Sequence, residues 1–138
     1  MTHPEMVEAW LADLPEPATW ERVREGFWYV RLPGSNRRWI PIELSLGART
    51  LKAVSHVIPD PIENREEVYR FLLRHNHAAS GVAFSFDGRE AVLCLVGRVS
   101  RTDLGPEALD ALAGAIVETT ERTFRSILQL GFASLLRK

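Results

Sequence analysis

Cysteine and long apolar runs are scarce in this sequence, and each scarcity excludes a class of protein. The single cysteine, Cys94, has no partner for an internal disulfide and cannot build a four-thiolate metal site. No apolar run approaches the roughly 20 residues that a membrane-spanning helix needs. The stretch MTHPEMVEAW at the start lacks the basic and apolar segments of a secretory signal. We therefore expect a cytoplasmic chain with no membrane segment.

The charge balance also argues against a nucleic-acid partner. The 17 lysines and arginines and the 18 acidic residues leave a net charge of −1. Phosphate binding needs a concentrated excess of cationic side chains. The chain is 46% apolar and 25% charged, as is usual for a globular protein. Its 138 residues are enough to bury one core, so residues 1–138 are expected to form a single domain.

Helical spacing of apolar residues near the N-terminus gives way to alternating stretches. The helical stripe consists of Met6, Val7, Trp10, Leu11 and Leu14. Alternation then predicts strands over residues 27–32, 40–46 and 50–58, and residues 20–24 are interpreted as the start of the first strand. Pro41 has no amide hydrogen to donate, so its backbone nitrogen should point away from a partner strand, at a sheet edge or a bulge.

The second half of the chain also combines helical and alternating patterns of apolar residues. A capping-box pattern at Asn64 predicts a helix over residues 65–77. An Asp-Gly turn between apolar runs predicts a hairpin of residues 82–86 and 91–98, whose second strand is apolar on both faces and therefore central. A long helix is predicted over residues 106–130. The order α-βββ-α-ββ-α predicts an α+β fold, with helices packed on an antiparallel sheet.

The letters HNH at residues 75–77 invite a metal or nuclease interpretation, which their spacing does not support. HNH nucleases carry these letters on separate pieces of a ββα unit. His75 and His77 diverge on a helix, because only residues three or four apart share a face. Zinc needs three or four ligands, and no acidic or cysteine partner is evident. We interpret Asn76 and His77 as the end of the helix, and we expect no metal and no cofactor.

No other group of residues forms a catalytic pattern. As a nucleophile, Cys94 would need a histidine base and an exposed pocket, so a buried hydrophobic role is preferred. The carboxylates of residues 60–67 surround a helix start and are explained as partners of the helix dipole. No glycine spacing matches a nucleotide-binding loop, and no serine lies in a nucleophile elbow. The chain is not expected to be an enzyme.

Several strings between residues 27 and 132 resemble the YbjN family of sensory-transduction regulators. They are RLPG at 31–34, ENREEVYRFLLRHN at 63–76, GVAFSFDG at 81–88, LVGRV at 95–99 and LGF at 130–132. The resemblance implies a fold similar to the type III secretion chaperones, small proteins that often dimerise and hold unfolded partner segments. It implies no catalytic residues. The family pattern has Arg at the position of His75 and an aromatic residue near Cys94, so any role of these two would be peculiar to this chain.

Aromatic residues are concentrated near the N-terminus, and alternation places some of them off the core face. Phe27 and Tyr29 fall opposite Trp28, and Trp39 leaves the apolar face of its strand. One explanation is ordinary partial burial of large rings. The other is an interface, where Trp and Tyr are enriched. The candidate interface residues are Trp10, Phe27, Tyr29 and Trp39.

Two hypotheses of function follow. The first is a non-catalytic, chaperone-like regulatory module that binds a segment of an unknown partner protein and forms a homodimer. The second is a small-molecule-sensing domain with a pocket between sheet and helices, in which Arg98 would be the polar anchor. The sequence identifies neither the partner nor the ligand.

Overall fold

A six-stranded antiparallel sheet is the framework of the computed structural model, which describes residues 1–79 and 81–137. The strands are β1 (Thr19–Arg24), β2 (Phe27–Pro33), β3 (Trp39–Leu46), β4 (Thr50–Pro59), β5 (Val82–Asp87) and β6 (Val92–Ser100). The helices are α1 (His3–Ala12), α2 (Arg65–Ala78), α3 (Pro106–Gly131) and α4 (Ala133–Leu136), and a 3-10 turn, η1 (Arg101–Asp103), follows β6. The spatial order of the strands is β1-β2-β3-β4-β6-β5. The predicted α+β class is confirmed.

Four strands, rather than the predicted three, precede α2. Residues 20–24 belong to a strand of their own, β1, which pairs antiparallel with β2. Every residue of β1 is exposed, so its sequence carries no apolar alternation from which a separate strand could be predicted. Its charged side chains suit a sheet edge, because they discourage pairing with another chain.

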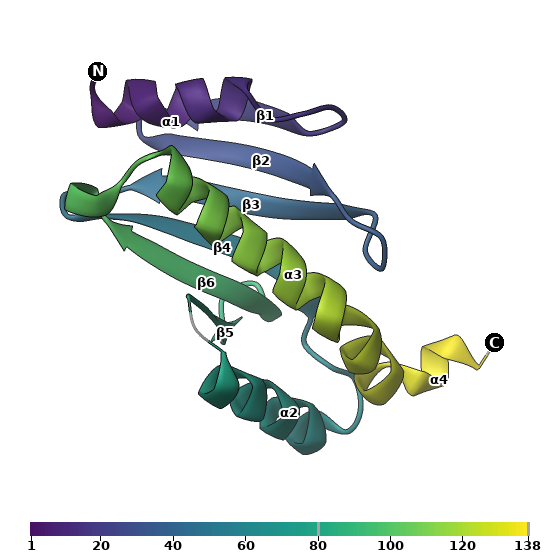
Figure 1. Ribbon diagram of the computed structural model, residues 1–138. Coiled ribbons are helices and arrows are strands. Elements are labelled where there is room, and N and C mark those ends of the chain that lie inside the picture. The colour runs from purple at the N-terminus through teal and green to yellow at the C-terminus, as the bar shows by residue number, and fades with distance from the viewer. Residues whose placement is uncertain (80, 138) are drawn as a thin grey trace.

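All of the long helices pack into a core on one face of the sheet. Helices α1 and α3 lie across that face, and α2 lies beside β5 (Figure 1). Core side chains such as Trp28, Ile42, Leu95 and Ile116 are at most 1% exposed. The alternate residues of β2, β3 and β4 that point the other way are partly exposed. Within the described residues no helix covers this second side, which we call the uncovered face.

Helices α1 and α3 begin as their sequences predict. The Thr2 hydroxyl accepts a hydrogen bond from the Glu5 amide at 3.2 Å and caps α1. Pro106 lies in the first turn of α3, where no amide donor is required. None of the helices in the described ranges is long and apolar enough to cross a membrane.

The start of α2 differs from the prediction. Asn64 has a left-handed backbone with φ of 51° and makes no side-chain cap on α2. Its side-chain amide instead donates to the carbonyl of Leu130 at 2.9 Å. The capping-box prediction is therefore wrong, because this side chain ties the start of α2 to the end of α3.

The end of α2 differs as well. The helix continues one residue further, to Ala78, so Asn76 and His77 lie in its last turn. The side chain of Asn76 hydrogen-bonds the backbone of Phe84 in β5, and the His75 ring meets the Phe84 ring edge-on with centroids 5.7 Å apart. Long-range contacts with β5 thus involve His75 and Asn76, whereas His77 is exposed in the last turn of α2.

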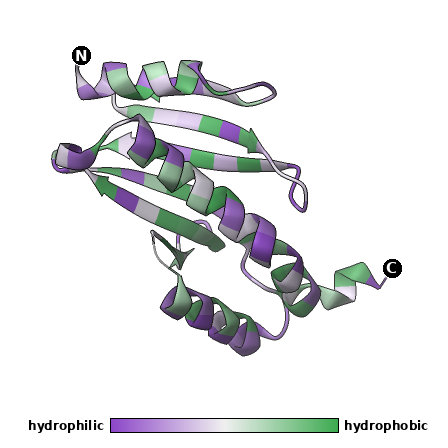
Figure 2. Cartoon of the chain, viewed as in Figure 1, coloured by the Kyte–Doolittle hydropathy of each residue, from purple (hydrophilic) through white to green (hydrophobic). Residues whose placement is uncertain are grey.

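Strand β6 is internal, as predicted, since it pairs with both β4 and β5. Figure 2 shows continuous hydrophobic colouring over its first half. Leu93 and Leu95 face the core, while Val92 and Cys94 are buried on the opposite face. Burial on both faces explains why this half of β6 shows no alternation of polar and apolar residues.

Candidate functional site

Three of the four candidate interface residues share the uncovered face. Phe27 and Tyr29 of β2 and Trp39 of β3 are partly exposed there. Two of the rings carry a stacked arginine: the Arg24 guanidinium lies 4.5 Å from the centre of the Phe27 ring, and that of Arg31 lies 4.5 Å from Trp39. Arginine and aromatic side chains are the residue types most enriched in protein interfaces.

Trp10, the fourth candidate, lies on the other side of the sheet. It is 8% exposed, and its indole Nε1 donates to Asp110 of α3 at 2.7 Å. The ring joins α1 to α3 while its polar atom keeps a hydrogen bond, as is common for buried tryptophan. The structure therefore places Phe27, Tyr29 and Trp39 on one face of the sheet, with Phe27 and Trp39 at opposite ends of the β2–β3 ladder, and Trp10 on the other face.

Arg98 lines an open groove of about 370 Å³ between the end of β6 and α3. Among the described residues, the pairing of β5 with β6 runs from Asp87↔Val92 to Val82↔Gly97, and Arg98 follows the last pair. The α3 wall carries small side chains, including Ala108 and Ala111, and the β6 wall adds the polar Ser100. By contrast, the enclosed space between the sheet and α3 measures only about 10 Å³. That space holds no more than one water molecule.

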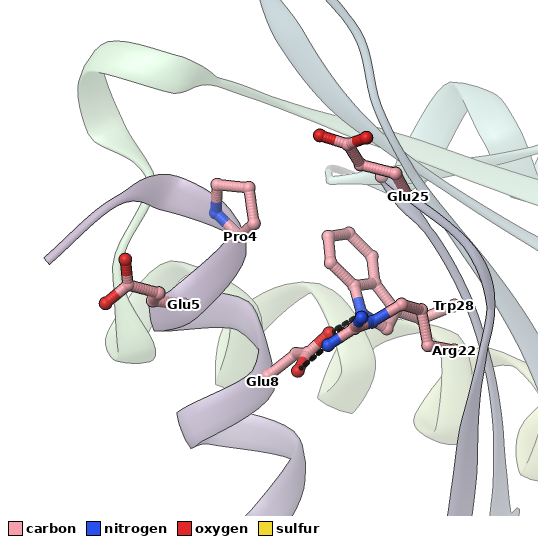
Figure 3. Close-up of a pocket in the computed structure, with 7 residues that line it drawn as sticks. Pro4, Glu5, Glu8, Arg22, Glu25 and Trp28 are labelled. Atoms are coloured by element: carbon pink, nitrogen blue, oxygen red, sulfur yellow. Dashed lines mark hydrogen bonds and ion pairs between the residues drawn. The ribbon is translucent and has the colours of Figure 1, made fainter.

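A hollow of about 290 Å³ lies between the start of α1 and the β1–β2 turn (Figure 3). There the Glu8 carboxylate accepts hydrogen bonds from Arg22 at 2.6 and 2.7 Å and from the Trp28 indole at 2.9 Å. The bonds from Arg22 and then Trp28 lower the pKa of Glu8 to about 2. Because both carboxylate oxygens are engaged, Glu8 fastens α1 to the sheet and is not available as an acid or base.

The sheet opens beside Pro41, as its missing amide hydrogen predicts. β2 and β3 pair along their whole length, but β3 pairs with β4 only from Glu43 to Leu46. Pro41 has no amide hydrogen to extend the ladder. A cavity of about 90 Å³ lies at the opening, lined by residues that include Tyr29, Pro41 and His56.

Cys94 lies on the uncovered face of β6, opposite His56 of β4 and Ser85 of β5. The residue is 2% exposed, and burial raises the pKa of its thiol to about 11, with further contributions from the Asp87 and Glu43 carboxylates. The thiol is therefore protonated at neutral pH. This agrees with its interpretation as a buried hydrophobic side chain and disfavours a nucleophilic role.

One cluster of potential metal ligands was not predicted from the sequence. Ligand atoms of His56, Asp87 and Cys94 lie within 4.8 Å of one another. The neighbouring cavity measures about 330 Å³. These residues come from three strands, so no short spacing in the sequence reveals them, and only the register of β4, β6 and β5 does so. The histidines considered from the sequence, His75 and His77, belong to α2 instead.

Comparison with solved structures defines the fold. A chain of the ExsC–ExsE complex matches 91% of this chain and 96% of its own length, with a TM-score of 0.62 and 20% identity. The complex of the Yersinia pestis type III secretion chaperone SycH with a fragment of YscM2 contains a chain that matches 86% of this chain and 97% of its own length, with a TM-score of 0.62 and 15% identity. The fold is type III secretion chaperone-like.

A further structure with this chaperone-like fold is the heterodimeric ExoU–SpcU complex from the type III secretion system of Pseudomonas aeruginosa. One of its chains matches 87% of this chain and 96% of its own length, with a TM-score of 0.60 and 18% identity. At such identities the likeness concerns the fold, because one fold hosts many functions.

The chain is similar in sequence to mycobacterial proteins. The uncharacterized proteins Rv0487 of Mycobacterium tuberculosis and ML2442 of Mycobacterium leprae are each 35% identical over 109 residues, which is 79% of this chain. The chain spans 59% of the length of these curated relatives. No protein-family model matches the chain.

Proposed function

We propose that this chain is a non-catalytic interaction module that binds a segment of a partner protein on the uncovered face of its sheet. The observation that carries the proposal is the set of partly exposed rings of Phe27, Tyr29 and Trp39 on that face. Aromatic residues are enriched in protein interfaces relative to the rest of the surface. Tryptophan, tyrosine and arginine are also the residues that dominate binding energy at interfaces.

The chaperone-like fold supports this proposal. SycH is a chaperone bound to a fragment of another protein, and ExoU–SpcU is a heterodimer. We propose an equivalent role for this chain, as a single YbjN-like domain over residues 1–138 in the cytoplasm. The argument rests on the aromatic surface together with the fold, because the fold alone does not determine a function.

We also propose that the chain forms a homodimer. A stable interface buries about 800 Å² on each partner. The aromatic rings of β2 and β3, with their stacked arginines, would lie at the centre of this interface in the free protein, so a second copy of the chain and the partner segment would compete for the uncovered face. Arginine over an aromatic ring suits this position, because the guanidinium stacks on the ring face and is more weakly hydrated than an ammonium group.

Light scattering and native affinity purification test the proposal through two matched tryptophan variants. Trp39→Ala removes a ring from the uncovered face. Trp20→Ala removes a ring that is 37% exposed on β1, where it pairs with the core-facing Val30. We expect Trp39→Ala to lower dimer or partner affinity by at least about tenfold, while Trp20→Ala leaves it unchanged.

The urea midpoint of Trp39→Ala should stay close to that of the wild type, because the ring does not belong to the core. A strictly monomeric wild type from which no protein co-purifies would overturn the proposal. Equal effects of the two variants on binding would overturn the choice of face.

A ligand-sensing role is the second candidate, favoured by the groove that Arg98 lines. Its volume of about 370 Å³ lies within the range of small-molecule sites. Thermal-shift screening with small carboxylates and phosphates should raise the melting temperature of the wild type and leave Arg98→Gln unaffected. Absence of any shift in the wild type would exclude this role for these anions.

A further inference from the structure

We propose that His56, Asp87 and Cys94 form a binding site for a divalent transition metal of the zinc type on the uncovered face. Their ligand atoms, a ring nitrogen, a carboxylate oxygen and a thiol sulfur, lie within 4.8 Å of one another. Zinc binds each of these donors, and the sulfur and imidazole select against magnesium and calcium. The site does not depend on the proposed partner binding.

The register of three neighbouring strands holds the ligands together. His56 of β4 lies directly opposite Cys94 of β6, and Cys94 lies opposite Ser85 of β5. Asp87 is two residues beyond Ser85, so it points to the same face and lies diagonal to Cys94. Opposed side chains on paired strands have Cβ atoms about 4.5–5.5 Å apart. Paired strands also restrict backbone movement, which favours a preorganised site.

The strand that carries His56 is locally irregular. The pairing of β4 with β6 shifts register between His56 and Ile58. On its other side β4 has lost its pairing with β3 beside Pro41. Such bulges redirect side chains and are frequent next to functional sites. The irregularity therefore lies directly beside the His56↔Cys94 pair.

The Asp87 carboxylate is held in place by the hairpin turn. Its Oδ1 accepts hydrogen bonds from the backbone amides of Arg89 at 2.9 Å and Glu90 at 3.3 Å. These bonds leave Oδ2 without a partner from the turn and therefore able to face a metal. Ligating carboxylates in metal sites are commonly oriented by such additional hydrogen bonds.

The spacing of the three ligand atoms requires little adjustment. In a tetrahedral zinc site with bonds of about 2.0–2.3 Å, neighbouring ligand atoms are roughly 3.5 Å apart. Atoms now within 4.8 Å of one another would close by little more than about 1 Å, which side-chain rotation supplies. All three residues line the cavity of about 330 Å³, which leaves room for water as a fourth ligand.

The charges of the site balance when the metal binds. Cys94 loses its thiol proton to the solvent on coordination. The thiolate and the Asp87 carboxylate then neutralise the dication, while His56 binds through its neutral ring. Glu43 and Lys52, which line the same cavity, carry opposite charges. A net-neutral cluster avoids leaving an uncompensated charge in a partly buried position.

Metal titration of the untagged protein tests the proposal. After treatment with a chelator, the protein should take up a single equivalent of Zn²⁺ in a competition titration, and excess Mg²⁺ should not displace it. Co²⁺ in place of Zn²⁺ should show the charge-transfer absorption of a cobalt–thiolate bond. A protein that takes up no Zn²⁺, or whose Co²⁺ form lacks this band, would overturn the proposal.

Four variants distinguish Zn²⁺ binding at this site from adventitious Zn²⁺ binding by other histidine side chains. His56→Gln and Asp87→Asn should each weaken Zn²⁺ binding by at least about tenfold, and Cys94→Ser should abolish the cobalt–thiolate band. His77→Gln, on the exposed side of α2, is the matched control and should bind as the wild type does. If Cys94→Ser does not fold, the Zn²⁺ affinities of His56→Gln and Asp87→Asn test the site, and circular dichroism shows whether these two variants are folded. An unchanged Zn²⁺ affinity in His56→Gln and Asp87→Asn would contradict the proposed site. An equal loss of Zn²⁺ affinity in His77→Gln would contradict it as well.

Discussion

The side chain of Asn76 hydrogen-bonds both backbone groups of Phe84. Its amide nitrogen donates to the Phe84 carbonyl at 3.1 Å, and its amide oxygen accepts from the Phe84 N–H at 2.7 Å. β5 is an edge strand, and α2 lies beside it (Figure 1). Asn76 thus satisfies the backbone N–H and C=O that an edge strand would otherwise leave unpaired at Phe84. The same hydrogen bonds hold α2 against the sheet.

Replacing this amide should destabilise the protein measurably. Asn76→Ala leaves a donor and an acceptor of Phe84 without their partner, and we expect the free energy of unfolding to fall by about 1–3 kcal/mol. Urea denaturation measures the change. His77→Ala, at the adjacent exposed position, should stay within about 0.5 kcal/mol of the wild type. Similar losses in both variants would show that the contact with Phe84 is not stabilising.

Two leucines of opposite burial test the placement of β6. Leu95 is 0% exposed and Leu73 is 67% exposed. Leu95→Ala should reduce the free energy of unfolding by about 2–5 kcal/mol, because the truncation leaves a cavity in the core. Leu73→Ala should change it by no more than about 0.5 kcal/mol. A loss below about 1 kcal/mol for Leu95→Ala would mean that β6 does not line the core.

Replacing two glycines by alanine should change the free energy of unfolding in opposite directions. A Cβ at Gly97 would lie 2.4 Å from the Leu112 Cδ1 and 2.9 Å from the Val82 Cγ1, whereas at Gly114 nothing lies within 4 Å. Gly97→Ala should therefore destabilise by about 1–3 kcal/mol through overpacking. Gly114→Ala, in an exposed part of α3, should stabilise by up to about 1 kcal/mol. Chemical denaturation of both variants checks the prediction, and a Gly97→Ala variant at least as stable as the wild type would refute the close packing of α3 on β6.

Acid denaturation should reveal the contact of Glu8 with Arg22. Hydrogen bonds from Arg22 and then Trp28 lower the pKa of Glu8 from 4.5 to about 2. Because the folded-state pKa is the lower one, the stabilisation is complete above about pH 4.5 and is lost as the pH falls towards 2. Urea midpoints between about pH 5 and pH 3 should consequently decline more steeply in the wild type than in Glu8→Gln.

Arg22→Gln provides the second arm of this experiment. Since the Arg22 bond is the largest cause of the lowered pKa of Glu8, this variant should lose most of the same pH dependence. Parallel curves for the wild type and Glu8→Gln would show that the ion pair does not act in solution.

Elements with a regular apolar period were predictable from the sequence. Alternation identified β3 and most of β2, and the 3.6-residue spacing identified α1 and α3, together with the α+β class. These signals are local, because side-chain direction repeats with the geometry of each backbone. β1 lacks such a signal, since all of its residues are exposed.

Contacts between distant residues were decided only by the tertiary structure. Asn64 was expected to cap its own helix but bonds to Leu130, and Trp10 was grouped with Trp39 but lies across the sheet from it. The cluster of His56, Asp87 and Cys94 likewise depends on the register of three strands. The sequence alone determined the periodic elements, the fold class and which alternate residues leave the core. Helix docking and strand register determined which of those residues meet, because neither is recorded in any local spacing.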